Sequence, residues 1–87
     1  MIDEDQIIKF PCMFPVKVMG LNNESFSSTV MAIFYKHLDP DRLSSSSRTS
    51  SGEKYLSITV TFMAKNRAQL DAIYEELNAH ELVMMTL

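Results

Sequence analysis

Few residues in this chain have the types and the spacing that catalysis or metal binding requires. The two histidines, His37 and His80, and the single cysteine, Cys12, form no recognisable metal-ligand spacing. Glu75 and Glu76 are adjacent, so on a helix they project in different directions and are poorly placed to act as paired acids. No nucleophile with a neighbouring base can be named. We therefore expect no catalytic site, no metal site and no cofactor, and predict that the protein is not an enzyme.

The residues better suited to a function lie on the exposed side of two predicted strands. In residues 54–62 apolar residues alternate with polar ones, a pattern typical of a strand that is buried on one face only, and residues 13–19 follow a similar pattern. Methionine is flexible and polarisable, so methionines on an open sheet face suit an adaptable protein contact. Scattered exposed apolar residues, which soluble proteins tolerate, are the alternative. The candidate interface residues are Met13, Lys17, Met19, Tyr55 and Met63, with Met13 expected near Met63 and Met19 near Tyr55.

The same face is a poor match to an RNA-binding sheet. RNA-binding sheets with helices on one face stack bases on aromatic side chains of their central strands. At these positions this chain has Ser57, Thr59 and Thr61. The chain also carries a net charge of −3 and no run of lysines or arginines. We therefore do not expect nucleic acid as a partner.

Two amphipathic helices are predicted to cover the other face of these strands. Apolar residues at helical spacing predict a first helix from residue 24 to about residue 38, ended by Pro40. A second helix is predicted after Asn66, whose pairing with Gln69 is of the capping-box type, and ends within residues 78–80. Both helices place their apolar stripe toward the sheet.

The remaining segments predict two more strands. Residues 42–53 are rich in serine and read as an edge strand followed by a hairpin turn at Gly52, although a hydroxyl-lined anion site with Arg42 and Arg48 is the functional alternative. Residues 82–87 read as a short final strand. The order is strand, helix, strand, strand, helix, strand. This order predicts an α+β, ferredoxin-like βαββαβ sandwich with two helices on one face of a four-stranded antiparallel sheet, in which the first and third strands are central.

Length and composition limit the domain organisation. With 87 residues the chain has room for one domain, which we place at residues 10–87 after a loosely ordered tail at residues 1–9. A domain of this size buries only about 60 to 65% of the surface that its unfolded chain exposes, so association into a homodimer would stabilise it. The single cysteine and the lack of a signal-like or membrane-spanning segment favour the cytoplasm and predict no membrane partner.

Four segments resemble the YbeD-like family of small bacterial proteins. They are residues 10–20, 56–61, 74–77 and 83–87, and they follow one another in the family's order. The resemblance extends over residues 10–87 but is weak across residues 21–52, where the serine run departs from the family's pattern. It implies a ferredoxin-like fold similar to the ACT regulatory domains of amino-acid metabolism. The biochemical role of the family is not established, so the resemblance implies a fold and no reaction.

The likeness to ACT domains implies one further candidate site. In those domains the loop that leaves the first strand commonly lines an amino-acid site at a subunit interface, and the corresponding residues here are Gly20, Leu21, Asn22 and Asn23. A glycine allows backbone amides to approach a ligand carboxylate, and neighbouring helix amides favour an anion. The alternative is a turn that needs glycine for an unusual backbone angle.

Two functions follow from these observations. The first is a non-enzymatic regulatory or adaptor domain that contacts a protein partner through the open sheet face or a strand edge. The second is an ACT-like sensor that binds a small amino acid or carboxylate metabolite at the first strand-helix turn.

Overall fold

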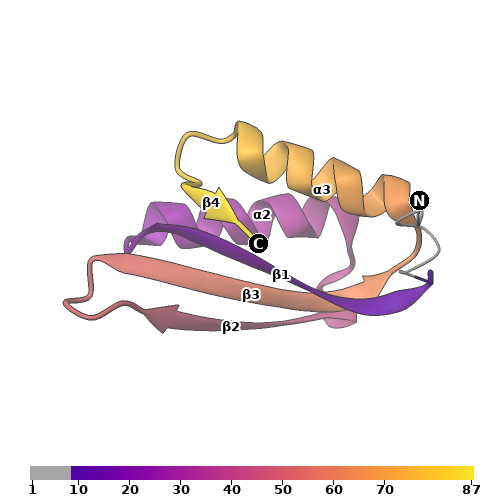
Figure 1. Cartoon of the computed structure of the whole chain (residues 1–87), viewed down its shortest axis with the longest axis horizontal. Coiled ribbons are helices and arrows are strands. Elements are labelled where there is room, and N and C mark those ends of the chain that lie inside the picture. Colours follow the sequence, from indigo (N-terminus) through magenta and orange to yellow (C-terminus); the bar gives the residue numbers. More distant parts are fainter. Residues whose placement is uncertain (1–8) are drawn as a thin grey trace, which may run out of the picture.

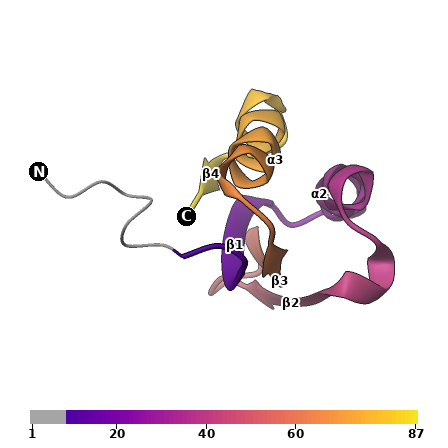
Figure 2. The ribbon, with the colours of Figure 1, turned by 90° about the vertical axis from the view of Figure 1, so that its right-hand side faces the viewer.

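A computed structural model of the protein describes residues 9–87, so the tail expected at residues 1–9 lies outside the described residues except for Lys9. Four antiparallel strands form one sheet in the order β2-β3-β1-β4, and both helices lie on the same side of it (Figures 1 and 2). The predicted ferredoxin-like fold is confirmed, and so is the central position of the first and third strands. The elements are β1 (Cys12–Leu21), α2 (Glu24–His37), the 3-10 turn η1 (Pro40–Arg42), β2 (Leu43–Thr49), β3 (Tyr55–Ala64), α3 (Arg67–Ala79) and β4 (Met85–Thr86).

The alternating pattern of β3 produces the buried face of the sheet. Every second residue from Leu56 to Ala64 is buried, while the residues between them face the side without helices. Phe62 meets Phe34 of α2 edge to face, with ring centroids 6.0 Å apart. The two helices add seven buried side chains to this core: Phe26, Val30, Ile33 and Phe34 from α2, and Leu70, Ile73 and Leu77 from α3. The core therefore lies between the sheet and the helix layer, and the opposite sheet face has no covering element within residues 9–87.

Asparagine begins both helices in the same way. The Asn23 side-chain oxygen accepts a hydrogen bond from the Phe26 amide at 2.8 Å, and the Asn66 oxygen accepts one from the Gln69 amide at 2.9 Å. Each bond satisfies one of the backbone N–H groups that a helix leaves without an internal partner. The cap of α2 is therefore Asn23 and not its neighbour Asn22.

Two predicted boundaries were wrong. Gly20 was expected to end the first strand, but it is buried within β1, and Leu21, predicted as part of a turn, is the last strand residue. The final strand is shorter than expected, because regular pairing covers only Met85–Thr86. Main-chain bonds nevertheless continue on both sides, since Met84 N donates to Met19 O at 2.8 Å and Lys17 and Leu87 exchange bonds of 3.2 and 2.8 Å.

The serine-rich segment forms the predicted edge strand and hairpin. The β2 strand pairs with β3 alone, and its residues after Leu43 are exposed. The turn that follows uses positive φ angles at Gly52 and Glu53, at 84° and 59°. The Ser50 hydroxyl accepts a bond from the Tyr55 amide at 3.0 Å and so closes the hairpin. Glycine provides the backbone freedom that this reversal needs.

No helix within residues 9–87 has the length and apolar character needed to span a membrane.

Candidate functional site

The open sheet face brings the predicted interface residues onto one surface. Met13 lies directly opposite Met63 in the register of β1 and β3, as expected, and both side chains are about half exposed, at 59% and 48%. The expected pairing of Met19 with Tyr55 was wrong by two residues, because Ser57 lies opposite Met19 and Tyr55 lies opposite Leu21. In an antiparallel ladder without a bulge the residue numbers of every pair have the same sum, so the pairing of Met13 with Met63 already requires Ser57 opposite Met19.

Two apolar residues of the last strand join this face. Met85 lies opposite Met19, and Leu87 lies opposite Lys17 through their paired main-chain hydrogen bonds. Met85 is 52% exposed and Leu87 is 64% exposed. Both were overlooked as interface residues, although the alternation of the predicted final strand and its place beside the first strand were a usable signal. The open face therefore carries exposed apolar side chains from three strands.

The face has a distinct charge. Its outward strand positions carry the cations Lys17 and Arg48 and, within residues 9–87, no acidic side chain. Lys54, which precedes β3, places its ammonium 5.4 Å from the centre of the Tyr55 ring. The chain as a whole has a net charge of −3, so this surface is positive against the overall balance.

Helix α3 holds the final strand in place from the other side. The Tyr74 hydroxyl donates to the main-chain oxygen of Leu87 at 3.1 Å, and the Thr86 hydroxyl donates to the side-chain oxygen of Asn78 at 3.0 Å. Burial raises the pKa of Tyr74, so its phenol keeps the proton that this bond requires. Since Thr86 points toward α3, its strand neighbour Met85 must point to the open face.

The second candidate site, the turn after the first strand, is closely packed. A side chain on Gly20 would collide with the ring of Phe26 and would come within 2.7 Å of the Leu82 carbonyl oxygen. Within residues 9–87 only Gly52 and Glu53 have positive φ angles, so an unusual backbone angle is not what requires glycine at position 20. The requirement is the close approach of α2 and of the chain before β4.

The polar groups of this turn are largely engaged within the protein. The Asn22 backbone amide donates to Lys54 O at 2.9 Å, and its side-chain amide donates to Glu53 O at 3.0 Å. The Asn23 side-chain oxygen caps α2. Gly20, Leu21, Asn22 and Asn23 therefore form a junction between β1, α2 and the β2–β3 hairpin. Amino-acid binding at this junction stays a prediction.

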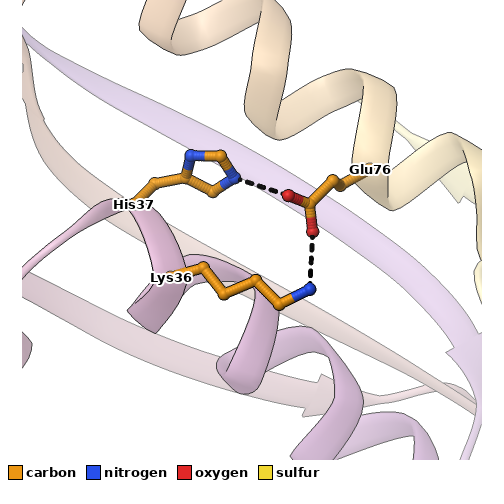
Figure 3. Close-up of polar contacts among 3 residues, drawn as sticks. All are labelled: Lys36, His37 and Glu76. Carbon is orange, nitrogen blue, oxygen red and sulfur yellow. Dashed lines mark hydrogen bonds and ion pairs between the residues drawn. The ribbon is translucent and has the colours of Figure 1, made fainter.

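A polar cluster joins the end of α2 to α3 (Figure 3). Glu76 accepts a hydrogen bond from the Lys36 ammonium at 3.2 Å and pairs with Nε2 of His37 at 3.0 Å. Hydrogen bonds from Lys36 and then from His37 lower the pKa of the Glu76 carboxyl. The cluster thus ties the two helices together through charge rather than through apolar contact.

The other residues with reactive side chains serve local structure. Nδ1 of His80 accepts a hydrogen bond from the Leu82 amide at 3.1 Å directly after α3. Cys12 is a free, half-buried cysteine at the start of β1. Within residues 9–87, no cluster of three or more His, Cys, Asp or Glu side chains is arranged to hold a metal ion.

The fold and these surfaces define a class of small ferredoxin-like domain with an open sheet face. The profile of the family described as "Protein of unknown function (DUF493)" matches residues 5–87. The chain belongs to this family, which is the YbeD-like family that its strand sequences resembled.

Similar proteins support the same assignment. The chain is 38% identical over 85 residues to UPF0250 protein NE1487 of Nitrosomonas europaea, an alignment that covers 97% of this chain and 98% of the relative. It is 39% identical over 89 residues to a UPF0250 protein of Chromobacterium violaceum, with both chains covered fully. The solution structure of protein HP0495 from H. pylori superposes with a TM-score of 0.74 at 21% identity, covering 92% of this chain and 85% of that one. The two UPF0250 proteins share the family and HP0495 shares the fold, and none of the three names states an activity.

Proposed function

We propose that this protein is a non-enzymatic regulatory or adaptor domain that acts in the cytoplasm by binding another protein through its open sheet face. The observation that carries the proposal is the gathering of exposed apolar side chains from β1, β3 and β4 on the face that no helix within residues 9–87 covers. These side chains are Met13, Met63, Met85, Leu21 and Leu87, together with the less exposed Met19.

The chemistry of the face indicates what kind of partner fits it. Methionines adapt to a partner's shape, and an interface usually draws most of its affinity from a few apolar anchors. Lys17 and Arg48 favour a partner with acidic residues beside its own apolar patch, because complementary charge guides association. The same two cations oppose face-to-face pairing of two copies, since like charges would be brought together. The occupant we propose is therefore a different protein with an acidic and apolar surface.

Met84 and Met85 allow a matched test of this face. They are neighbours with similar exposure, 60% and 52%, but only Met85 lies within β4 and is paired with Met19 of the open face. We expect Met85→Glu to weaken partner binding by at least tenfold, because it adds a negative charge that an acidic partner repels and removes an anchor worth about 1 to 2 kcal/mol. Met84→Glu should leave the affinity within about twofold of wild type.

The experiment begins with capture of partners from a bacterial extract and continues with the purified partner. Titration by calorimetry compares wild type, Met85→Glu and Met84→Glu, and methyl NMR follows the methionines of the open face in the complex. Shifts at Met13, Met63 and Met85 without a shift at Met84 would support the proposal. Equal affinities for the two variants, or shifts confined to the helix side, would refute it.

Homodimer formation is a separate matter from partner binding. Among residues 9–87, no strand pairs with the outer edge of the seven-residue strand β2, so a second copy could add its own strand there. Light scattering over a range of protein concentrations measures the oligomeric state. A constant monomer mass would exclude the homodimer while leaving the open-face proposal intact.

The alternative function, amino-acid sensing at residues 20–23, is tested by thermal shift. A specific ligand at a hundred times its dissociation constant adds about 2.7 kcal/mol of stability, which is readily detected in a domain of this size. Stabilisation by one amino acid, abolished by Asn22→Ala, would favour the sensor. An absence of stabilisation across the common amino acids would reject it.

A further inference from the structure

A hollow lies at the end of the molecule opposite the Gly20 turn. It has a volume of about 520 Å³ and is lined by residues from the end of α2, from η1 and from the loop between β3 and α3. These segments lie on the right-hand side of Figure 1. Sites for small molecules commonly have volumes of about 300 to 1,000 Å³, so the space is sufficient for a small ligand. The hollow shares Met63 with the proposed protein contact and contains none of the other open-face side chains named for that contact.

Basic side chains from three separate segments line the hollow. Lys36 comes from the last turn of α2, Arg42 from η1 and Lys65 from the loop between β3 and α3. They are three of the eight lysines and arginines in a chain whose net charge is −3. Among the described residues that line the hollow, Asp39 is the one carboxylate. The side chains that line the hollow therefore include more cations than anions, whereas the whole chain has a net negative charge.

Two of these cations have no internal counter-ion. Neither Arg42 nor Lys65 forms an ion pair with another residue of the described range 9–87. Lys36 is paired with Glu76, but an ammonium group has three N–H donors and the 3.2 Å contact uses one of them. Bringing like charges together around one space is unfavourable unless an anion offsets them. The arrangement thus places unused hydrogen-bond donors from three different segments around one hollow.

We propose that this hollow binds a small, multiply charged oxyanion through Arg42, Lys65 and Lys36. The planar guanidinium of Arg42 matches the paired oxygens of a phosphate or carboxylate group, and the two lysines add point charges. Gln69 adds a side-chain amide, and Leu38 and Met63 supply apolar wall for the carbon skeleton of an organic anion. The ligand class is a phosphate ester or a polycarboxylate with at least two negative charges.

Amide NMR with inorganic pyrophosphate and citrate, each added at constant ionic strength, tests the site. We expect saturable shifts at residues 36–39, 42, 65 and 69, and no such response to sodium chloride. Tighter binding of pyrophosphate would assign the site to phosphate compounds, and tighter binding of citrate to polycarboxylates. A response to neither anion, or shifts that rise in proportion to concentration all over the surface, would overturn the proposal.

Matched variants separate a specific site from the effect of net charge. Arg42→Gln and Lys65→Gln should each weaken binding of the better anion at least threefold, and the double variant at least tenfold. Arg48→Gln and Lys17→Gln remove the same charges from the open face and should leave the affinity unchanged. Equal losses in both pairs would refute the site. Arg42→Lys, which keeps the charge but loses the planar fork, should bind less tightly than wild type.

Circular dichroism confirms that each variant is folded, which is expected because these basic side chains are exposed. The hollow variants should still bind the protein partner of the open face. Failure of one proposal is thereby distinguishable from failure of the other.

Discussion

The two turns that lead from a strand into a helix are built alike but differ in their surroundings. In both, an asparagine caps the helix, Asn23 for α2 and Asn66 for α3. The first turn is covered by the Phe26 ring and bonded to the β2–β3 hairpin through Asn22. The second turn lies at the other end of the sheet (Figure 1). It borders a hollow that Lys65 helps to line.

The difference shows that a glycine before a helix is weak support for a ligand site. At the first turn the glycine is explained by packing, since the space that its missing side chain leaves is filled by the protein itself. At the second turn no glycine is present, yet cations from three segments meet around open space. A candidate ligand site differs here from a structural junction because some of its polar side chains remain unpaired after folding.

The largest expected effect tests whether the first turn is as tightly packed as the structure shows. Gly20→Ala should destabilise the protein by about 2 to 3 kcal/mol, because the added methyl group collides with Phe26 and with the Leu82 carbonyl. Urea denaturation measures the change. Gly52→Ala is the control, since nothing lies within 4 Å of that position and only its φ of +84° opposes a side chain, at a cost of about 1 kcal/mol. A Gly20→Ala variant as stable as wild type would reveal room for a ligand at this turn.

A smaller effect compares the two helix caps directly. Asn23→Ala and Asn66→Ala should each cost about 1 kcal/mol, because each leaves one helix amide without its side-chain acceptor. Equilibrium denaturation of both variants checks that the two losses of stability are equal. A much larger loss of stability for Asn23→Ala would mean that this cap also supports the packing of the first turn. The two turns would then differ in energy as well as in surroundings.

The hairpin that supports the first turn offers a stabilising change. Glu53 has a φ of 59°, where an L-residue is strained, and its side chain makes no hydrogen bond or ion pair within residues 9–87. Glu53→Gly should raise the free energy of unfolding by about 0.5 kcal/mol, as relief of strain exceeds the added backbone entropy of the unfolded chain. The thermal midpoint of unfolding measures this gain. A lower midpoint would show that the Glu53 side chain contributes more than its backbone angle costs.

The smallest effect concerns the stability of the protein at acid pH, through the cluster of Lys36, His37 and Glu76. Hydrogen bonds from Lys36 and His37 lower the pKa of Glu76 from its usual 4.5. The ionised carboxylate therefore stabilises the folded protein at pH values above 4.5, and this contribution is lost as the pH falls through the lowered pKa. Glu76→Gln should therefore flatten the decline in stability below about pH 4.5, as followed by urea denaturation at several pH values. The same variant frees Lys36 and should tighten pyrophosphate binding about twofold. An unchanged acid profile would show that the cluster contributes nothing to folding.

Local patterns in the sequence were sufficient to predict most of the fold. The alternation around Ile58, the apolar stripes of the helices and the capping pair Asn66 and Gln69 all depend on neighbours within a few residues, and the structure contains each of them. The boundaries of β1 and β4 were less accurate, because the pairing partner decides where a strand ends. The open-face methionines Met13 and Met63 were identified, whereas Met85 was recognised only from its pairing with Met19.

The sequence by itself determined which residues face the core, since a periodicity of 2 or 3.6 residues reports the exposed side of any strand or helix. It also determined the order of the elements, and the connection rules then leave few topologies. The tertiary structure alone decided that Phe26 and Leu82 fill the space at Gly20, and that Lys36, Arg42 and Lys65 meet at one hollow. The physical reason is that these contacts join segments separated in the sequence, so they depend on how the elements pack against one another.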